Sequence, residues 1–141
     1  MPTTFAVIDA GSNAIRLQVA SVDQPGTYRV IEQDRRAVRL GHAVFETGAL
    51  DPESRTEALE ALKRFKAVAD KHGAKVVRAV ATSAMREAKD GPSFIKEAAE
   101  LGLSLEILSE ENEARLISLG ILSGLKFDPP LGLFMHTIAA V

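Results

Sequence analysis

Hydrophobic and polar positions alternate along the first forty residues, in segments that short polar turns interrupt. The apolar run Phe5–Ile8 is too short for a helix and predicts a buried strand ending at Asp9. Alternation resumes over residues 15–20, so a tight turn at residues 11–13 predicts a hairpin. After a turn signal at residues 23–26, the alternating segment Tyr28–Leu40 predicts a third strand.

Helical spacing replaces alternation after residue 50. We expect a loop over Gly41–Leu50 and then a helix over Glu53–His72, with Asp51 as its cap and Gly73 ending it. The expected elements that follow are a strand over Lys75–Ala81, a helical stretch opened by Thr82 and Ser83, a helix capped by Ser93 and running to Leu101, a strand over Leu103–Leu108, and a helix capped by Ser109 from Glu110 to about Gly124.

This order of elements predicts the fold class. Three strands joined by short turns form an antiparallel meander, and the later strands return through helical crossovers. We therefore expect an α/β domain with a mixed five-stranded sheet and helices packed on it.

Composition narrows the class of protein. The 141 residues with 46% hydrophobic content suit one domain with a buried core. A formal charge of −2 provides no global attraction for nucleic acid or an anionic membrane, so we expect neither partner. Cysteine is absent, which excludes disulfides and thiolate chemistry, and we expect a cytoplasmic protein without a signal peptide. The histidines His42, His72 and His136 show no metal-ligand spacing.

The polar turn after the first strand carries the first candidate chemistry. Gly11 can adopt the positive φ of an anion-binding nest of backbone N–H groups, and Ser12 and Asn13 add side-chain donors. A plain connection is the alternative, because turns favour the same residue types. Neither a dinucleotide fingerprint nor a Walker loop follows the strand.

Three segments together resemble the exopolyphosphatase and guanosine pentaphosphate phosphohydrolase (Ppx/GppA) family. They read VIDAGSNAIRL over Val7–Leu17, AVATSAMREAKDG over Ala79–Gly91 and ILSEENEARLISLGI over Ile107–Ile121. A softer match, VRLGHAVFETGALDPES, fills the interval Val38–Ser54. The order and separation of these segments make the resemblance specific over roughly residues 5–125.

The resemblance implies a fold and a domain organisation. It implies the actin-like ATPase and sugar kinase superfold, a ribonuclease H-like architecture with two related α/β domains and a cleft between them. Residues 1–126 are similar to the first domain, and residues 127–141 to the linker and the start of a second domain whose glycine-rich phosphate loop is missing here. We expect self-association through the apolar tail, residues 131–141, giving a possible homodimer.

The resemblance also implies an activity. The family's chemistry is Mg²⁺-dependent hydrolysis that releases terminal phosphate from inorganic polyphosphate or from guanosine pentaphosphate, a stringent-response nucleotide. The choice between these substrates stays open, and we expect the 141 residues alone to be inactive. The alternatives are a non-catalytic phosphate- or nucleotide-binding module, and a nucleotide-binding half of another member of the superfold.

Motif positions assign the binding roles. By resemblance, Gly11, Ser12, Asn13 and Arg86 would bind phosphate oxygens, and Asp9 would hold Mg²⁺ through water. The plainer reading of Asp9 is a carboxylate that caps its own turn. The plainer interpretation of Arg86 is that it is a solvent-exposed helix residue.

The catalytic residues implied by the resemblance are Glu113 and Arg86. Glu113 would act as general base on the attacking water, and Arg86 would clamp the transferred phosphoryl group. Alternatively, Glu113 is one of several acids that complement a helix dipole. The segment departs from the family pattern because Glu110 stands in place of a glycine and Asn112 in place of a second glutamate.

Overall fold

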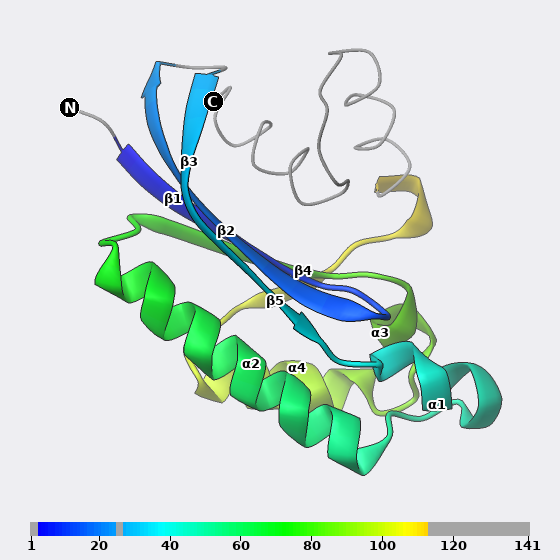
Figure 1. Cartoon of the computed structure of the whole chain (residues 1–141). Helices are drawn as coiled ribbons and strands as arrows, with labels where there is room; N and C mark the ends of the chain where they lie inside the picture. Colours follow the sequence, from blue (N-terminus) through cyan, green and yellow to red (C-terminus); the bar gives the residue numbers. More distant parts are fainter. Residues whose placement is uncertain (1–2, 25–26, 113–141) are drawn as a thin grey trace.

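The central strand of the sheet is β1, Thr3–Ala10, in a computed structural model that describes residues 3–24 and 27–112. It pairs antiparallel with β2, Ala14–Gln24, and parallel with β4, Val76–Ala81. The five strands lie in the order β3-β2-β1-β4-β5, and helices cover one face of the sheet (Figure 1). The predicted α/β class with a mixed five-stranded sheet is confirmed.

The first three strands form the predicted meander. β3, Thr27–Ala37, pairs antiparallel with β2, and the alternation in β2 sends Ile15, Leu17 and Val19 into the core. The expected end of the third strand at Leu40 is wrong, because β3 ends at Ala37. Beyond it the chain turns inward, as the Leu40 N–H donates to the Val38 carbonyl over 2.9 Å.

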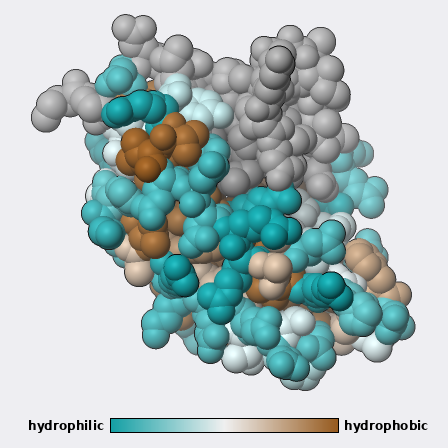
Figure 2. Space-filling model, in the orientation of Figure 1, coloured by the Kyte–Doolittle hydropathy of each residue, from teal (hydrophilic) through white to brown (hydrophobic). Residues whose placement is uncertain are grey.

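Among the strands that the structure describes, β3 lies at an edge of the sheet, with β2 as its one neighbour. Val30 and Ile31 on this strand are exposed large hydrophobic residues. Figure 2 shows a compact brown patch over the end of the molecule where β3 lies, on a face that is otherwise largely hydrophilic. Charged residues follow these two along the strand, and charges on an edge disfavour pairing with other chains.

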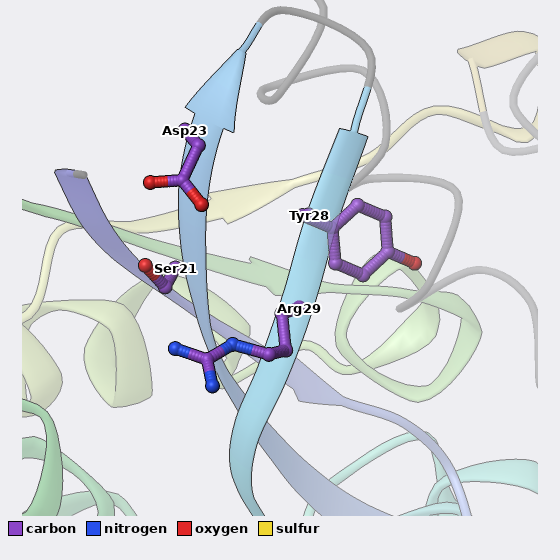
Figure 3. A pocket seen from close by; sticks show the side chains of 4 residues that line it. All are labelled: Ser21, Asp23, Tyr28 and Arg29. Atoms are coloured by element: carbon purple, nitrogen blue, oxygen red, sulfur yellow. The ribbon is translucent and has the colours of Figure 1, made fainter.

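A small pocket of about 200 Å³ lies near the turn between β2 and β3. Ser21 and Asp23 line it from β2, and Tyr28 and Arg29 line it from β3 (Figure 3). Burial raises the pKa of the Tyr28 phenol above its usual value, because the protein interior disfavours the phenolate. None of the residues singled out in the sequence lies in this pocket.

The segment after β3 forms α1, Leu40–Thr47, where the sequence predicted a loop. The predicted loop over Gly41–Leu50 is therefore wrong. Leu40 and Val44 are buried at helical spacing, which anchors the helix to the core. Gly48 ends it with a φ of 80°, and its N–H donates to the Val44 carbonyl, so this glycine is a helix C-cap.

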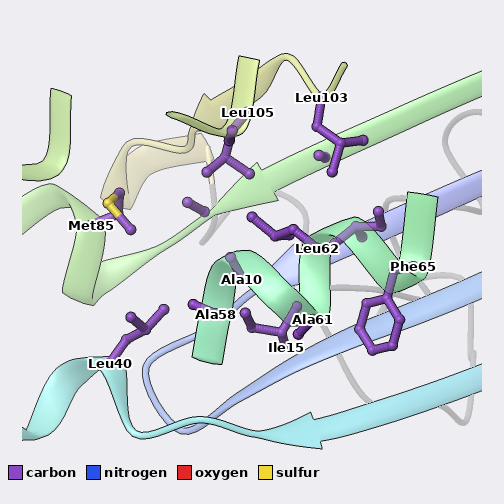
Figure 4. Packing of buried hydrophobic residues seen from close by; sticks show 14 of the residues in the cluster. Ala10, Ile15, Leu40, Ala58, Ala61, Leu62, Phe65, Met85, Leu103 and Leu105 are labelled. Atoms are coloured by element: carbon purple, nitrogen blue, oxygen red, sulfur yellow. The ribbon is translucent and has the colours of Figure 1, made fainter. Parts of the chain in front are cut away.

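The longest helix, α2, spans Pro52–Lys71 and matches the prediction closely. Asp51 caps it by accepting the Ser54 N–H over 3.0 Å, and Gly73 follows its end with a φ of 67°. One face of α2 packs on the sheet, as Figure 4 shows. Its buried residues are Ala58, Ala61, Leu62, Phe65 and Ala69.

Two short helices and the last strand complete the described fold. They are α3, Ser83–Glu87, α4, Gly91–Glu100, and β5, Leu105–Ile107, which runs parallel to β4. The prediction that Ser93 caps a helix is wrong, because α4 begins two residues earlier. Pro92 at the first turn lacks an N–H that would need a partner there, which favours the earlier start.

The last predicted helix is described only at its start. Ser109 accepts the Asn112 N–H over 3.1 Å, as a helix cap does. The rest of that helix, the linker at residues 127–141 and the apolar tail lie outside the described residues. Among the helices that the structure does describe, none has the length and apolar character needed to cross a membrane.

Phe65 and Phe45 form a matched pair for testing the core. Phe65 on α2 is 1% exposed, whereas Phe45 on α1 is 62% exposed. We expect Phe65→Ala to lower the free energy of unfolding by about 3–5 kcal/mol, because it removes buried contacts and leaves a cavity. Phe45→Ala should change it by less than about 0.5 kcal/mol. Urea unfolding followed by circular dichroism measures both, and equal losses would contradict this packing.

Tyr28 is the single tyrosine of a chain without tryptophan, so its ionisation can be followed by tyrosinate absorbance. We expect the folded chain to titrate above about 10 and the urea-unfolded chain near about 10, since burial raises the folded pKa. The unfolded state then releases its proton first as pH rises. The free energy of unfolding should be unaffected below the unfolded pKa and fall between the unfolded and folded values. Identical titration midpoints would refute the burial of this phenol.

Candidate functional site

The carboxyl ends of three parallel strands meet at one edge of the sheet. The Thr82 N–H, just after β4, donates to the Ala10 carbonyl of β1 over 3.4 Å. The Leu108 N–H, just after β5, donates to the Ala81 carbonyl over 2.9 Å. Figure 1 shows α1 and α3 at the same end of the sheet as the β1–β2 turn. This edge is where α/β sheets place ligand-binding loops.

The turn at residues 11–13 is tight but does not have the expected glycine conformation. Gly11 does not have a positive φ, since the left-handed glycines of the described chain are Gly48, Gly73 and Gly102. Its N–H donates across the turn to the Ala14 carbonyl over 3.0 Å. A Cβ at Gly11 would lie 3.1 Å from that oxygen, so the close turn accounts for the glycine. The Gly11 N–H is therefore used by the turn itself.

The next two residues have their carbonyl groups occupied. The Ser12 carbonyl accepts the Gly41 N–H over 2.9 Å, and the Asn13 carbonyl accepts the Val38 N–H over 3.1 Å. Within the described residues, the main-chain N–H groups of Ser12 and Asn13 make no hydrogen bond, and the Asn13 side chain is exposed. The turn thus keeps donors available and acceptors occupied, which suits an anion.

The second matched segment meets this turn through a hydroxyl pair. The Oγ atoms of Ser12 and Ser83 are 2.7 Å apart, which joins the turn to the first residue of α3. From α3, Arg86 Nη1 donates to the Leu108 carbonyl over 2.7 Å. Because Leu108 follows β5 directly, this bond places the guanidinium over the ends of β4 and β5. The structure therefore brings Arg86 to the same edge as residues 11–13.

The segment after α3 is held by an arginine of α2. Arg55 Nη1 donates to Asp90 over 3.2 Å, and Nη2 donates to Ser93 over 2.7 Å and pairs with Glu97. The other oxygen of Asp90 accepts the Leu50 N–H over 2.9 Å. These bonds tie α2, α4 and the chain after α1 to the residues that follow α3. They restrict the end of the helix that carries Arg86.

Asp9 is buried, 4% exposed, at the end of β1. Its register partner on β2 is Arg16, so the two side chains emerge on the same face of the sheet. The described residues contain no group of three or more histidine, aspartate or glutamate side chains that could hold a metal ion. A single carboxylate can still take part in holding Mg²⁺, because this ion takes one or two protein carboxylates and completes its shell with water and phosphate oxygens.

The predicted general base, Glu113, lies outside the described residues. The helix start before it is described, and Glu110 and Asn112 are exposed there. Of the predicted site residues, the structure gathers Asp9, residues 11–13 and Arg86 at one edge.

A pocket of about 470 Å³ adjoins the turn, and sequence reasoning missed most of its lining. Ser12 and Asn13 of the turn and Gly41 of α1 are among its lining residues. The remaining lining residues are Arg39, His42, Phe45 and Glu46, on or beside α1. Helical spacing of the apolar residues 40 and 44, ended by a glycine at 48, was the signal that could have revealed this helix.

Comparison with known proteins agrees with the resemblance seen in the sequence. The family model described as the Ppx/GppA phosphatase family matches residues 18–131. Exopolyphosphatase 2 of Mycobacterium tuberculosis is 33% identical over 123 residues. That match covers 81% of this chain and 39% of the relative.

Solved structures show the same relationship. The Ppx/GppA family member of Aquifex aeolicus superposes with a TM-score of 0.81 at 33% identity, covering 91% of this chain and 42% of that one. An exopolyphosphatase from Cytophaga hutchinsonii gives a TM-score of 0.80 at 27% identity, covering 86% and 39%. The chain thus spans about two fifths of the length of these relatives, with their actin-like fold. It belongs to the Ppx/GppA phosphatase family.

Proposed function

We propose that this chain is the N-terminal half of a Mg²⁺-dependent phosphohydrolase that releases terminal phosphate from inorganic polyphosphate or guanosine pentaphosphate. The observation that carries the proposal is the turn at residues 11–13, whose N–H groups lie at the sheet edge that also holds Arg86. The relatives named exopolyphosphatase support the choice of a phosphate chain as substrate.

Binding of the phosphate chain would begin at the turn. The N–H groups of Ser12 and Asn13 and the Asn13 amide would donate to phosphate oxygens. Arg86 would direct a guanidinium N–H at the transferred group while Nη1 stays bonded to Leu108. A chain with a net charge of −2 needs such local donors to attract a polyanion.

Asp9 would hold a hydrated Mg²⁺ at the same edge. When bound, the ion would neutralise charge on the phosphate oxygens during transfer. The carboxylate sits one residue before Ala10, whose carbonyl bonds to the start of the α3 segment. Asp9 thus comes two residues before the turn, and the hydrogen bond of Ala10 next to it joins this strand end to Thr82, just before the helix that carries Arg86.

Hydrolysis would use Glu113 as general base. The carboxylate would take a proton from water as the water oxygen attacks the terminal phosphorus. The bond from that phosphorus to the bridging oxygen would break, giving inorganic phosphate and a shortened chain, with no covalent enzyme intermediate. Arg86 would stabilise the charge that develops on the equatorial oxygens.

The alternative proposal is a phosphate-binding module without turnover. Such a module needs only the donors of the turn and Arg86, which lie at one edge of the sheet. Phosphate release by the 141 residues alone distinguishes the two. Sustained Mg²⁺-dependent turnover would eliminate the pure binding module, whereas binding without turnover would support it.

Asn13 tests the phosphate-binding turn. We expect Asn13→Ala to weaken polyphosphate binding by about tenfold to a hundredfold, because it removes a hydrogen bond to a charged group worth about 1.5–3 kcal/mol. Thermal unfolding should be unchanged, since the side chain is exposed. The control is Gln33→Ala, which removes an exposed amide from β3. Isothermal titration calorimetry measures both variants, and equal affinity in Asn13→Ala and the unaltered chain would reject the turn as the binding site.

Glu113 tests the assigned base. In a longer chain that carries the second glycine-rich loop, we expect Glu113→Gln to abolish phosphate release while polyphosphate binding survives. The amide keeps the size of the carboxylate but cannot accept the proton. Phosphate release is measured colorimetrically, beside Glu111→Gln as a neighbouring exposed acid. Full activity in Glu113→Gln would remove this residue from the mechanism.

A further inference from the structure

The pocket beside the 11–13 turn has a lining that phosphate alone does not explain. His42, Phe45 and Glu46 lie at helical spacing on one face of α1, and all three line the pocket. Leu40 and Val44, on the other face, are buried in the core. The helix therefore contributes an aromatic ring and a carboxylate to a pocket that the candidate phosphate turn also lines.

Phe45 is held against that turn. It is 62% exposed, the largest exposed fraction among the large hydrophobic residues of the described chain. A Cβ added at Gly41 would lie 2.9 Å from Phe45 Cε2 and 2.9 Å from Ser12 Cβ. The Phe45 ring and the Ser12 side chain thus lie close together beside Gly41, and a side chain at position 41 would not fit between them. An apolar ring face in this position is available for stacking.

Glu46 also favours a ligand with an aromatic, hydrogen-bond-donating part. Its carboxylate only accepts hydrogen bonds, and its negative charge would repel an anionic phosphate group. A nucleobase has a π-face for Phe45 and ring N–H or amino donors for a carboxylate. The pocket volume, about 470 Å³, lies in the range of small-molecule sites, which is about 300–1,000 Å³.

We propose that this pocket binds the nucleobase of a nucleotide whose phosphates lie on the turn at residues 11–13. Phe45 stacks on the base, Glu46 accepts from its N–H groups, and Arg39 at the rim contacts the phosphate oxygens nearest the nucleoside. This proposal rests on the proposed function only in placing the phosphates of the nucleotide on the turn. It makes a nucleoside polyphosphate, rather than a bare phosphate chain, the better ligand.

The test compares guanosine triphosphate with inorganic tripolyphosphate, which carry phosphate chains of the same length. We expect the 141-residue chain to bind the nucleotide about tenfold or more tightly in calorimetry with Mg²⁺. Phe45→Ala should remove this advantage and leave tripolyphosphate binding unchanged, while Phe45→Tyr retains it. Glu46→Gln should weaken the nucleotide and, by removing a repelling charge, slightly strengthen tripolyphosphate.

The control is Ile31→Ala, which truncates an exposed apolar residue on β3 and should change neither affinity. If both ligands bind with equal affinity, or if Phe45→Ala still binds the nucleotide more tightly than tripolyphosphate, the nucleobase pocket is rejected. The proposal that the turn binds phosphate is then retained. If the nucleotide binds through Phe45 while tripolyphosphate does not bind, the pocket stands and the phosphate turn fails. If neither ligand binds, both proposals are overturned.

Discussion

The pairing of β1 on both of its edges is the constraint on which the rest of the structure depends. An antiparallel neighbour on one side and a parallel neighbour on the other leave no freedom of register, and Val7 and Ile8 are fully buried. The parallel side aligns the ends of β1, β4 and β5. The antiparallel side requires a tight turn at that same end. Asp9, the turn and the start of α3 are therefore brought together by strand pairing.

Much of this arrangement could be predicted from the sequence, because it depends on patterns that repeat along the chain. Alternation in residues 15–20 revealed β2, and the cap at Asp51 with helical spacing revealed α2. The meander and the later helical crossovers then followed from the lengths of the connections. The placement of Arg86 beyond a strand end was predictable on the same grounds, since parallel strands align their carboxyl ends.

The contacts that shape the site were not predictable, because each depends on the packing of distant segments. The sequence predicts a loop at Gly41, yet this residue lies inside α1, where a side chain would collide with Ser12 and Phe45. The sequence cannot show such a close approach between residues almost thirty positions apart. In the same way, the sequence could not show that the Gly11 N–H, expected to take part in an anion-binding nest, donates to the Ala14 carbonyl instead.

The connection between α1 and the turn bears on how a ligand could use both. The Gly41 N–H holds the Ser12 carbonyl, and Leu40 and Val44 hold α1 in the core, so the pocket and the turn form one packed unit. The bond between Ser12 and Ser83 joins this unit to α3 and hence to Arg86. Association is weakened by the entropy lost when mobile groups are ordered. Because main-chain bonds already hold the turn and α1 together, a ligand that spanned the turn and the pocket would require little added ordering of the backbone.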